Sequence, residues 1–114
     1  MKYLQKGKVL YIHLEGELDH HSAKGFKEEI EKAFAPTDWR HIIFDLKEVS
    51  FMDSSGIGMI IGRYKNANER GGTVAIAGMS PELSRIYQIS GLAKIINSYA
   101  DVEEAEEALN GKVQ

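Results

Sequence analysis

The chain has 114 residues, of which 43% are hydrophobic and 27% charged, as is typical of one globular domain and too apolar for a disordered chain. It has no cysteine, which excludes disulfide frameworks and thiol chemistry, and its net charge of −3 disfavours direct binding to a nucleic-acid backbone. No stretch resembles a secretory signal or a membrane span of about 20 residues, so we expect a single cytoplasmic domain over residues 1–114 that contacts no membrane.

The first third of the chain predicts two strands and a helix. Residues 3–5 predict a short edge strand that turns at Lys6 and Gly7, and residues 9–14 alternate as a strand with one buried face does. From Asp19 onward, apolar residues recur at helical spacing. This pattern predicts an amphipathic helix that Asp19 or Ser22 caps and that Pro36 ends.

The middle third predicts a central strand followed by a second helix. Residues 41–46 form a nearly continuous apolar run, as expected of a strand covered on both faces, and residues 47–52 read as a loop. The second helix ends at Gly71 and Gly72. Its apolar stripe is predicted to consist of Ile57, Ile60, Ile61, Tyr64 and Ala67.

The last third predicts a strand, a helix, a strand and a helix. Residues 73–77 are rich in β-forming residues, and Ser80 with Pro81 opens a third helix, whose buried stripe is Leu83, Ile86, Tyr87 and Ile89. Residues 94–99 predict the last strand. Asp101 and Glu104 resemble a capping box for a final acidic helix through Leu109, and residues 110–114 are expected to fray.

This order of elements predicts an α/β fold. Strands separated by helices favour parallel pairing, whereas the first two strands form an antiparallel pair. We therefore expect a mixed, mainly parallel sheet of four to five strands with about four helices. Ligands and partners of such sheets gather where strands end and helices begin.

That edge carries the sequence Asp53-Ser54-Ser55-Gly56. The unpaired N–H groups of a helix start favour negative charge, so the position can accommodate a phosphate. The simpler interpretation is that Asp53 or Ser54 only caps the helix. Because one side chain suffices for a cap, we expect at least one of the two hydroxyls to face solvent.

Three enzymatic or cofactor interpretations are disfavoured. Glycines at 56, 58 and 62 suggest a dinucleotide loop, but the next strand ends in Gly78 rather than an acidic residue, and close helix–sheet packing explains the glycines better. The pattern G-x-S-x-G of serine hydrolases is absent. Neighbouring His20 and His21 have no further ligand at metal-binding spacing. We expect no catalytic residue, cofactor or metal.

The other residues with distinctive chemistry have structural or surface interpretations. His13, His41 and Trp39 are expected to be structural, with Trp39 closing the edge of a core. Met59 lies off the predicted apolar stripe, and Ile57 is expected to be partly exposed. Exposed apolar side chains beside a modifiable serine indicate a protein interface.

Two segments carry a family resemblance. These are Gly16-Glu-Leu-Asp-His-His21 and Ser50-Phe-Met-Asp-Ser-Ser-Gly-Ile-Gly58, the second of which continues through Met59-Ile-Ile-Gly-Arg-Tyr-Lys65. With them the chain resembles the STAS family of anti-sigma factor antagonists over essentially its whole length. The histidine pair and Gly-Arg-Tyr-Lys point to the sporulation branch of that family.

The resemblance implies a STAS fold and a phosphorylation switch. The serine that follows the aspartate of the motif is Ser54, and the resemblance makes it the target of an ATP-dependent serine kinase that is itself the anti-sigma factor. The unphosphorylated chain would bind the nucleotide-loaded kinase and release sporulation sigma factor F, and a serine phosphatase would restore binding after phosphorylation. The expected partner contacts are Asp19, Asp53, Ser55, Gly56, Ile57 and Met59.

Other roles remain open at this point. The same fold could serve as a general-stress anti-sigma antagonist or as the accessory domain of a transport system. A small nucleotide-binding or hydrolytic enzyme is a third hypothesis, although no metal ligand, base or phosphate loop is readable in the sequence.

Overall fold

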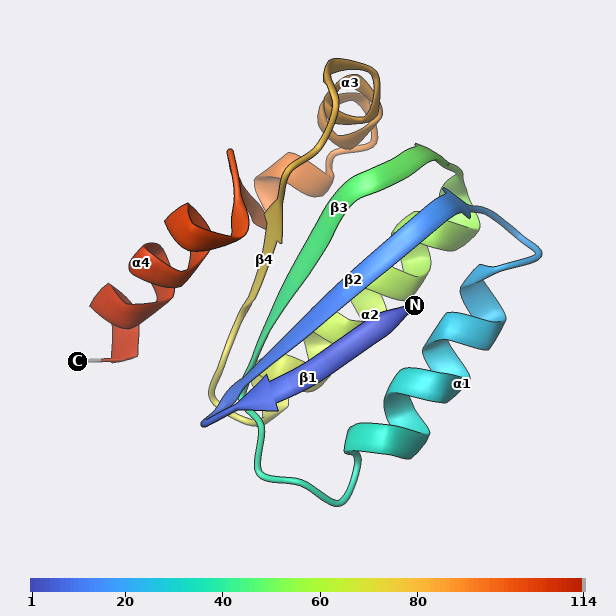
Figure 1. The fold of residues 1–114 in the computed structure, drawn as a ribbon. Coiled ribbons are helices and arrows are strands. Elements are labelled where there is room, and N and C mark those ends of the chain that lie inside the picture. Colours follow the sequence, from blue (N-terminus) through green and yellow to red (C-terminus); the bar gives the residue numbers. More distant parts are fainter. Residues whose placement is uncertain (114) are drawn as a thin grey trace.

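The structure, a computed structural model, describes residues 1–113 and contains one mixed sheet flanked by helices (Figure 1). The elements in chain order are β1 (Lys2–Lys6), β2 (Val9–Leu18), α1 (Ala23–Phe34), β3 (His41–Met52), α2 (Ser54–Glu69), β4 (Val74–Ala77), α3 (Pro81–Ile89), the 3-10 helix η1 (Leu92–Lys94), β5 (Asn97–Tyr99) and α4 (Val102–Val113). The strand order is β1-β2-β3-β4-β5; β1 pairs with β2 antiparallel, and the other pairs are parallel. The predicted α/β fold is therefore confirmed.

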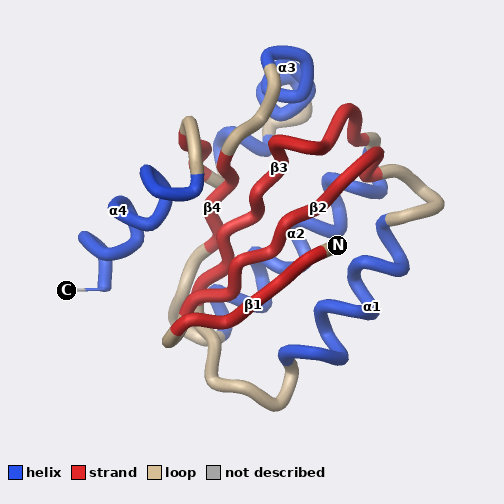
Figure 2. The backbone as a smooth tube through the Cα atoms, viewed as in Figure 1, coloured by secondary structure: helices blue, strands red, loops and turns tan. Residues whose placement is uncertain are grey.

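The helices are divided unequally between the two faces of the sheet (Figure 2). Helices α1, α2 and α3 contribute to the larger core, whose strand residues include Ile12, Phe44 and Ile76. Helix α4 covers part of the other face, where Ala105 and Leu109 pack with Ile43 and alanines of β4. No helix in the described part of the chain is long and apolar enough to cross a membrane.

Strand β3 is twice as long as the apolar run that predicts it. The expectation of a loop at residues 47–52 is wrong, because β3 stays paired to β2 up to the pair Leu18 and Met52. Two register shifts interrupt this pairing, one between His13 and Glu15 and one between Gly16 and Glu17. Such irregularities break the alternation of buried and exposed residues, so the second half of the strand has no period-2 signature.

The predicted apolar stripe of α2 is shifted around the helix. The structure buries Gly56, Met59, Ile60, Arg63 and Ala67, whereas Ile57, Ile61 and Tyr64 are only half-buried. Helix α1 lies beside α2 on the same side of the sheet (Figure 1), so α2 is covered on two sides. This second contact explains why an arginine and a methionine outside the predicted stripe are buried.

Three predictions for the C-terminal third need correction. Ile89 is 80% exposed rather than buried, because it lies about 200° around the helix from the buried Tyr87. Residues 94–96 precede the last strand and belong to η1 and the turn after it. Helix α4 continues to Val113, past the expected end at Leu109; Gln114, the last residue of the predicted frayed tail, lies outside the described residues.

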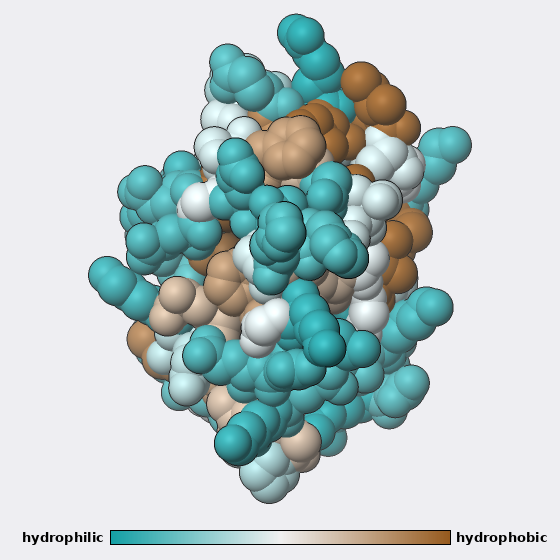
Figure 3. All heavy atoms as spheres, turned by 90° about the vertical axis from the view of Figure 1, so that its right-hand side faces the viewer, coloured by the Kyte–Doolittle hydropathy of each residue, from teal (hydrophilic) through white to brown (hydrophobic). Residues whose placement is uncertain are grey.

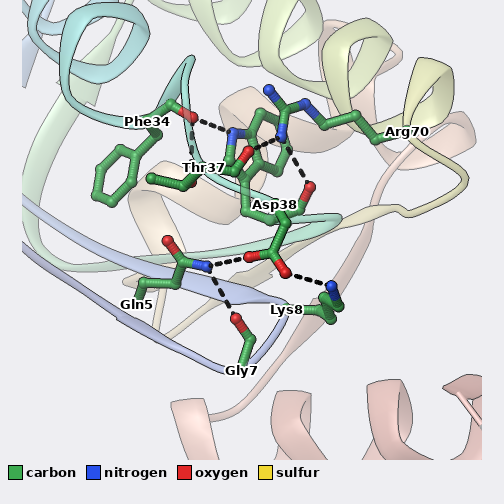
Figure 4. Close-up of polar contacts among 8 residues, drawn as sticks. Gln5, Gly7, Lys8, Phe34, Thr37, Asp38 and Arg70 are labelled. Carbon is green, nitrogen blue, oxygen red and sulfur yellow. Dashed lines mark hydrogen bonds and ion pairs between the residues drawn. The ribbon is translucent and has the colours of Figure 1, made fainter.

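Arg70 at the end of α2 contacts the loop that precedes β3, and Figure 4 shows its guanidinium at the carbonyl of Thr37. Trp39 is 5% exposed and donates Nε1–H to the carbonyl of Phe34 at 2.9 Å, which confirms its predicted place at the edge of the core. The Arg70 guanidinium lies 4.3 Å from the Trp39 ring and donates to the carbonyls of Ala35, Thr37 and Trp39. It thereby ties the end of α2 to the loop between α1 and β3.

Two histidines have structural contacts within the sheet, as expected. His41 is buried, and its Nδ1 accepts the N–H of Thr73 at 3.1 Å, next to the start of β4. His13 Nδ1 lies 3.1 Å from Oδ2 of Asp45 on the neighbouring strand. Both contacts join elements that are more than 30 residues apart in sequence.

Candidate functional site

The carboxyl ends of β2 and β3 bring the two sequence motifs together. Leu18 and Met52 are paired in the sheet, so Asp19 and Asp53 each follow one of two adjacent strand ends. The N–H of Asp53 donates to the carbonyl of Leu18 at 3.1 Å. The N–H of His20 donates in the other direction, to Asp53 Oδ2 at 3.2 Å. The loop before α1 and the start of α2 therefore form one edge.

Asp53 is the cap of α2. Its backbone is extended, and its Oδ1 accepts the N–H groups of Ser55 at 2.8 Å and Gly56 at 3.1 Å. Two of the donors that a helix start leaves unpaired are therefore already satisfied. With the bond from His20, both carboxylate oxygens of Asp53 are engaged inside the chain. Its role in this structure is to position the site.

The serine hydroxyls are left free by this cap. Ser54 is the first residue of α2 and is exposed, whereas Ser55 is half-buried. Within the described residues neither hydroxyl makes a hydrogen bond. The prediction of a free hydroxyl at this edge is thus confirmed, and Ser54 is the more accessible of the two. A group added to Ser54 would extend into solvent.

Asp19 is held by its own loop. Its Oδ1 accepts the N–H groups of His21 at 2.9 Å and Ser22 at 3.0 Å. The hydrogen bond from the Ser22 backbone is the main cause of a lowered pKa of the Asp19 carboxyl, and the bond from His21 adds to it. Asp19 is therefore ionised at neutral pH. Ser22 does not cap α1 through its side chain; its Oγ instead donates to the carbonyl of Glu17 at 2.6 Å.

Burial changes the roles expected of two residues in α2, Met59 and Gly56. Met59 is 4% exposed, so the expectation that it lies on the surface is wrong. Gly56 is also buried, and a Cβ there would lie 2.1 Å from the carbonyl oxygen of Leu18, so only glycine fits. Ile57 is half-buried, in line with the expected partial exposure.

The packing explanation for the glycines holds for only one of the three. Gly56 has the predicted close contact with the end of β2. A Cβ at Gly58 or Gly62, by contrast, would meet nothing within 4 Å. Close helix–sheet packing is therefore wrong as the reason for those two glycines.

Sequence reasoning missed one exposed aromatic residue at this edge. Phe51 is 42% exposed and pairs with Glu17, directly after the register shift between β2 and β3. That irregularity leaves both Ser50 and Phe51 exposed between the buried Val49 and Met52. In the sequence, only the two residues Ser50 and Phe51 between the buried Val49 and Met52 reflect this irregularity. Two residues are too few to identify a bulge from the sequence.

The surface around the site is mainly polar. Figure 3 looks at the molecule from the side of α1, and hydrophilic residues cover most of this view. His20 and His21 are exposed, and their rings lie 5.8 Å apart in an edge-to-face arrangement. The described residues contain no group of three or more His, Cys, Asp or Glu side chains that could hold a metal ion. What the edge offers is an accessible hydroxyl, an ionised aspartate and an exposed aromatic ring.

Comparisons with known proteins agree with this geometry. The model of the STAS domain family matches residues 1–105. An anti-sigma F factor antagonist of Paenibacillus polymyxa is 42% identical over 91 residues, which are 80% of this chain and 78% of that protein. An anti-sigma-B factor antagonist of Listeria monocytogenes is 33% identical over 100 residues, 88% of this chain and 83% of the relative. The solved structure of the anti-sigma factor antagonist SpoIIAA in its unphosphorylated form aligns with a TM-score of 0.82 at 31% identity and covers 96% of each chain.

Proposed function

This chain belongs to the STAS domain family and is an anti-sigma factor antagonist, and from that premise we propose that it is switched by phosphorylation of Ser54. Its unphosphorylated form binds a nucleotide-loaded serine kinase that acts as the anti-sigma factor, and this binding releases sporulation sigma factor F. The kinase phosphorylates Ser54 and ends the binding, and a serine phosphatase reverses the modification. The chain itself catalyses nothing and acts in the cytoplasm, where transcription takes place.

The observation that carries this proposal is the position of Ser54. Its hydroxyl is exposed at the first residue of α2 and has no hydrogen bond to give up, because Asp53 already caps the helix. A kinase can therefore reach Ser54 without unfolding the edge. The relative SpoIIAA has solved structures in both an unphosphorylated and a phosphorylated form, which supports phosphorylation as a property of this family.

The effect of the phosphate follows from the charges around it. Phosphorylation adds a charge of about −1.5 to −2 next to Asp53 and close to the loop that holds Asp19. The N–H groups of Ser55 and Gly56 are occupied by Asp53, so they do not neutralise the phosphate. The added charge therefore remains at the interface, where it repels the nucleotide phosphates of the kinase and forces apolar neighbours such as Phe51 to stay hydrated.

We assign the residues of this edge separate roles in binding. Asp19 pairs with a basic residue of the kinase, because its loop holds the carboxylate in a fixed orientation and keeps it ionised. Ile57 and Phe51 supply apolar contact, and Ser55 lies at the rim. Gly56 and Asp53 act on binding only indirectly. Gly56 allows α2 to approach β2, and Asp53 fixes the start of α2.

The test combines phosphate mapping with binding measurements. The purified chain is mixed with the anti-sigma kinase of the same organism and ATP, and the phosphate is located by mass spectrometry. Ser54→Ala should bind the kinase but take no phosphate. Ser54→Asp should fold and bind 100-fold to 1,000-fold more weakly, equivalent to about 3–4 kcal/mol. Ser55→Ala is the matched control and should be phosphorylated normally; a phosphate on Ser55 would refute the assignment.

The choice between sigma factor F and sigma factor B is tested by competition. The chain is more similar to the anti-sigma F antagonist of Paenibacillus polymyxa than to the anti-sigma-B antagonist of Listeria monocytogenes, and this difference favours the sporulation pathway. If the host has both kinases, the chain should bind the sigma F kinase more tightly. Preferential binding to the sigma-B kinase would instead support the role of a general-stress antagonist.

A further inference from the structure

Two glycines on α2 have no structural reason to be glycine. Gly58 and Gly62 lie inside the helix, and open space surrounds the position of a Cβ at each. Glycine in a helix interior is less stable than alanine, because it loses more backbone freedom on folding. Compared with alanine, glycine at these two positions therefore lowers the stability of the helix and makes no additional contact. The two glycines leave a strip of the α2 surface without side chains.

This strip forms part of a groove between α1 and α2. We call it the α1–α2 groove, and its lining is His20, His21, Ala23, Lys24, Lys27, Ser55, Gly58, Met59, Gly62 and Arg63. Along α2 it reaches from Ser55 to Arg63, a distance of about 12 Å at 1.5 Å per residue. A side chain at position 58 or 62 would project into the open space of the groove.

At one end of the groove lies a buried arginine, Arg63, one of whose nitrogen atoms has no hydrogen-bond partner in the described part of the chain. Arg63 is 4% exposed; its Nε donates to Asn66 Oδ1 at 2.9 Å, and its Nη2 lies 4.0 Å from Glu31 Oε1. Its Nη1 is buried and has no hydrogen-bond partner among the described residues. A buried donor without an acceptor is unfavourable and rare in native proteins. Because Arg63 belongs to the lining of the groove, an anionic group bound there is a candidate for the missing acceptor.

The charges along the groove have one sign. Lys24, Lys27 and Arg63 are cationic, and no Asp or Glu belongs to the lining. This basic strip contrasts with the net charge of −3 of the whole chain. The groove therefore complements a ligand that carries negative charge.

The shape of the groove favours a peptide over a single phosphate ion. The N–H groups of Ser55 and Gly56, which could hold a phosphate, are already bonded to Asp53. A length of about 12 Å matches three to four residues of extended chain at about 3.3 Å each. The absence of side chains at Gly58 and Gly62 also allows another backbone to approach α2 closely.

We propose that the α1–α2 groove binds an acidic peptide segment of a protein partner, with one carboxylate of that segment bonded to Nη1 of Arg63. Lys24 and Lys27 pair with further carboxylates, and the surface at Gly58 and Gly62 contacts the peptide backbone. Ser54 itself is not part of the lining of the groove, although its neighbour Ser55 is.

The test is a titration of the ¹⁵N-labelled full chain with an acetylated tetraglutamate peptide, followed by amide NMR. The shifts should concentrate at Gly58, Gly62 and Ala23, and a tetraglutamine peptide should cause none. The double variant Gly58→Ala, Gly62→Ala fills the groove and should bind at least tenfold more weakly, although its thermal midpoint rises. Gly25→Ala, on an exposed part of α1 outside the groove, should leave binding unchanged.

Charge variants provide the second readout. Arg63→Gln and the double variant Lys24→Glu, Lys27→Glu should each weaken peptide binding at least tenfold. Lys32→Glu reverses one charge on α1 outside the groove, half the charge change of the double variant, and should have little effect. The proposal is overturned if inorganic phosphate shifts the same amides as strongly as the peptide, if the peptide shifts none of them, or if the groove-filling variant binds like the unmodified chain.

Discussion

A single methyl group should have opposite effects at two glycines of α2 that are only two residues apart. In Gly56→Ala the new Cβ would lie 2.1 Å from the carbonyl oxygen of Leu18 and 2.7 Å from its Cβ. The first distance is more than 1 Å shorter than the 3.4 Å at which ordinary contact begins. In Gly58→Ala the same methyl group meets nothing within 4 Å.

The magnitudes follow from three terms. Overpacking against rigid backbone costs about 1–3 kcal/mol, and moving α2 away from β2 weakens the hydrogen bond from Asp53 to Leu18, which is worth about 1 kcal/mol. At either position, alanine stabilises the helix by up to about 1 kcal/mol relative to glycine. Gly56→Ala should therefore destabilise the chain by about 2 kcal/mol, whereas Gly58→Ala should stabilise it by up to about 1 kcal/mol.

Urea denaturation of both variants, evaluated by linear extrapolation, measures these free energies of unfolding directly. The slope of the free energy against urea should stay constant, because the surface exposed on unfolding hardly changes. If the two substitutions shift stability in the same direction, the close approach of α2 to β2 is not what requires glycine at position 56.

Three further substitutions, with Ser54→Ala as a control, test the contacts that hold the edge and its support. Asp53→Ala removes the acceptor of the Ser55 and Gly56 N–H groups and should cost about 1–2 kcal/mol in urea denaturation, while Ser54→Ala should stay within about 0.5 kcal/mol. Arg70→Ala removes three carbonyl contacts and the stacking on Trp39, so it should cost about 2–3 kcal/mol by the same assay, and an unchanged midpoint would contradict these contacts, of which Figure 4 shows the one to Thr37. The lowered pKa of Asp19 means that its stabilising contribution is complete above its ordinary value of 3.8 and is lost as the pH falls through the folded-state value. Asp19→Asn should therefore flatten the acid side of the stability profile and leave its alkaline side unchanged.

The kind and order of the elements could be predicted from the sequence because local patterns encode them. The run at residues 41–46, the cap at Asp53 and the pair Ser80-Pro81 each specify their element through neighbouring residues. The motif around Ser54 belongs to the same class, since the cap and the free hydroxyl are adjacent in sequence. For that reason, the position of the site on the fold was also predictable.

Only the tertiary structure decided which sides of these elements are covered. Residues 47–52 extend β3 because β2 offers a paired backbone across two irregularities, and no pattern within the segment reports that partner. Met59 and Arg63 are buried because α1 lies beside α2, whereas Gly58 and Gly62 face the open groove between the same two helices. Helical periodicity describes one face of one helix, but burial depends on every element that packs against it. The sequence by itself therefore determined where Ser54 lies, and the packing of α1 against α2 determined what surrounds it.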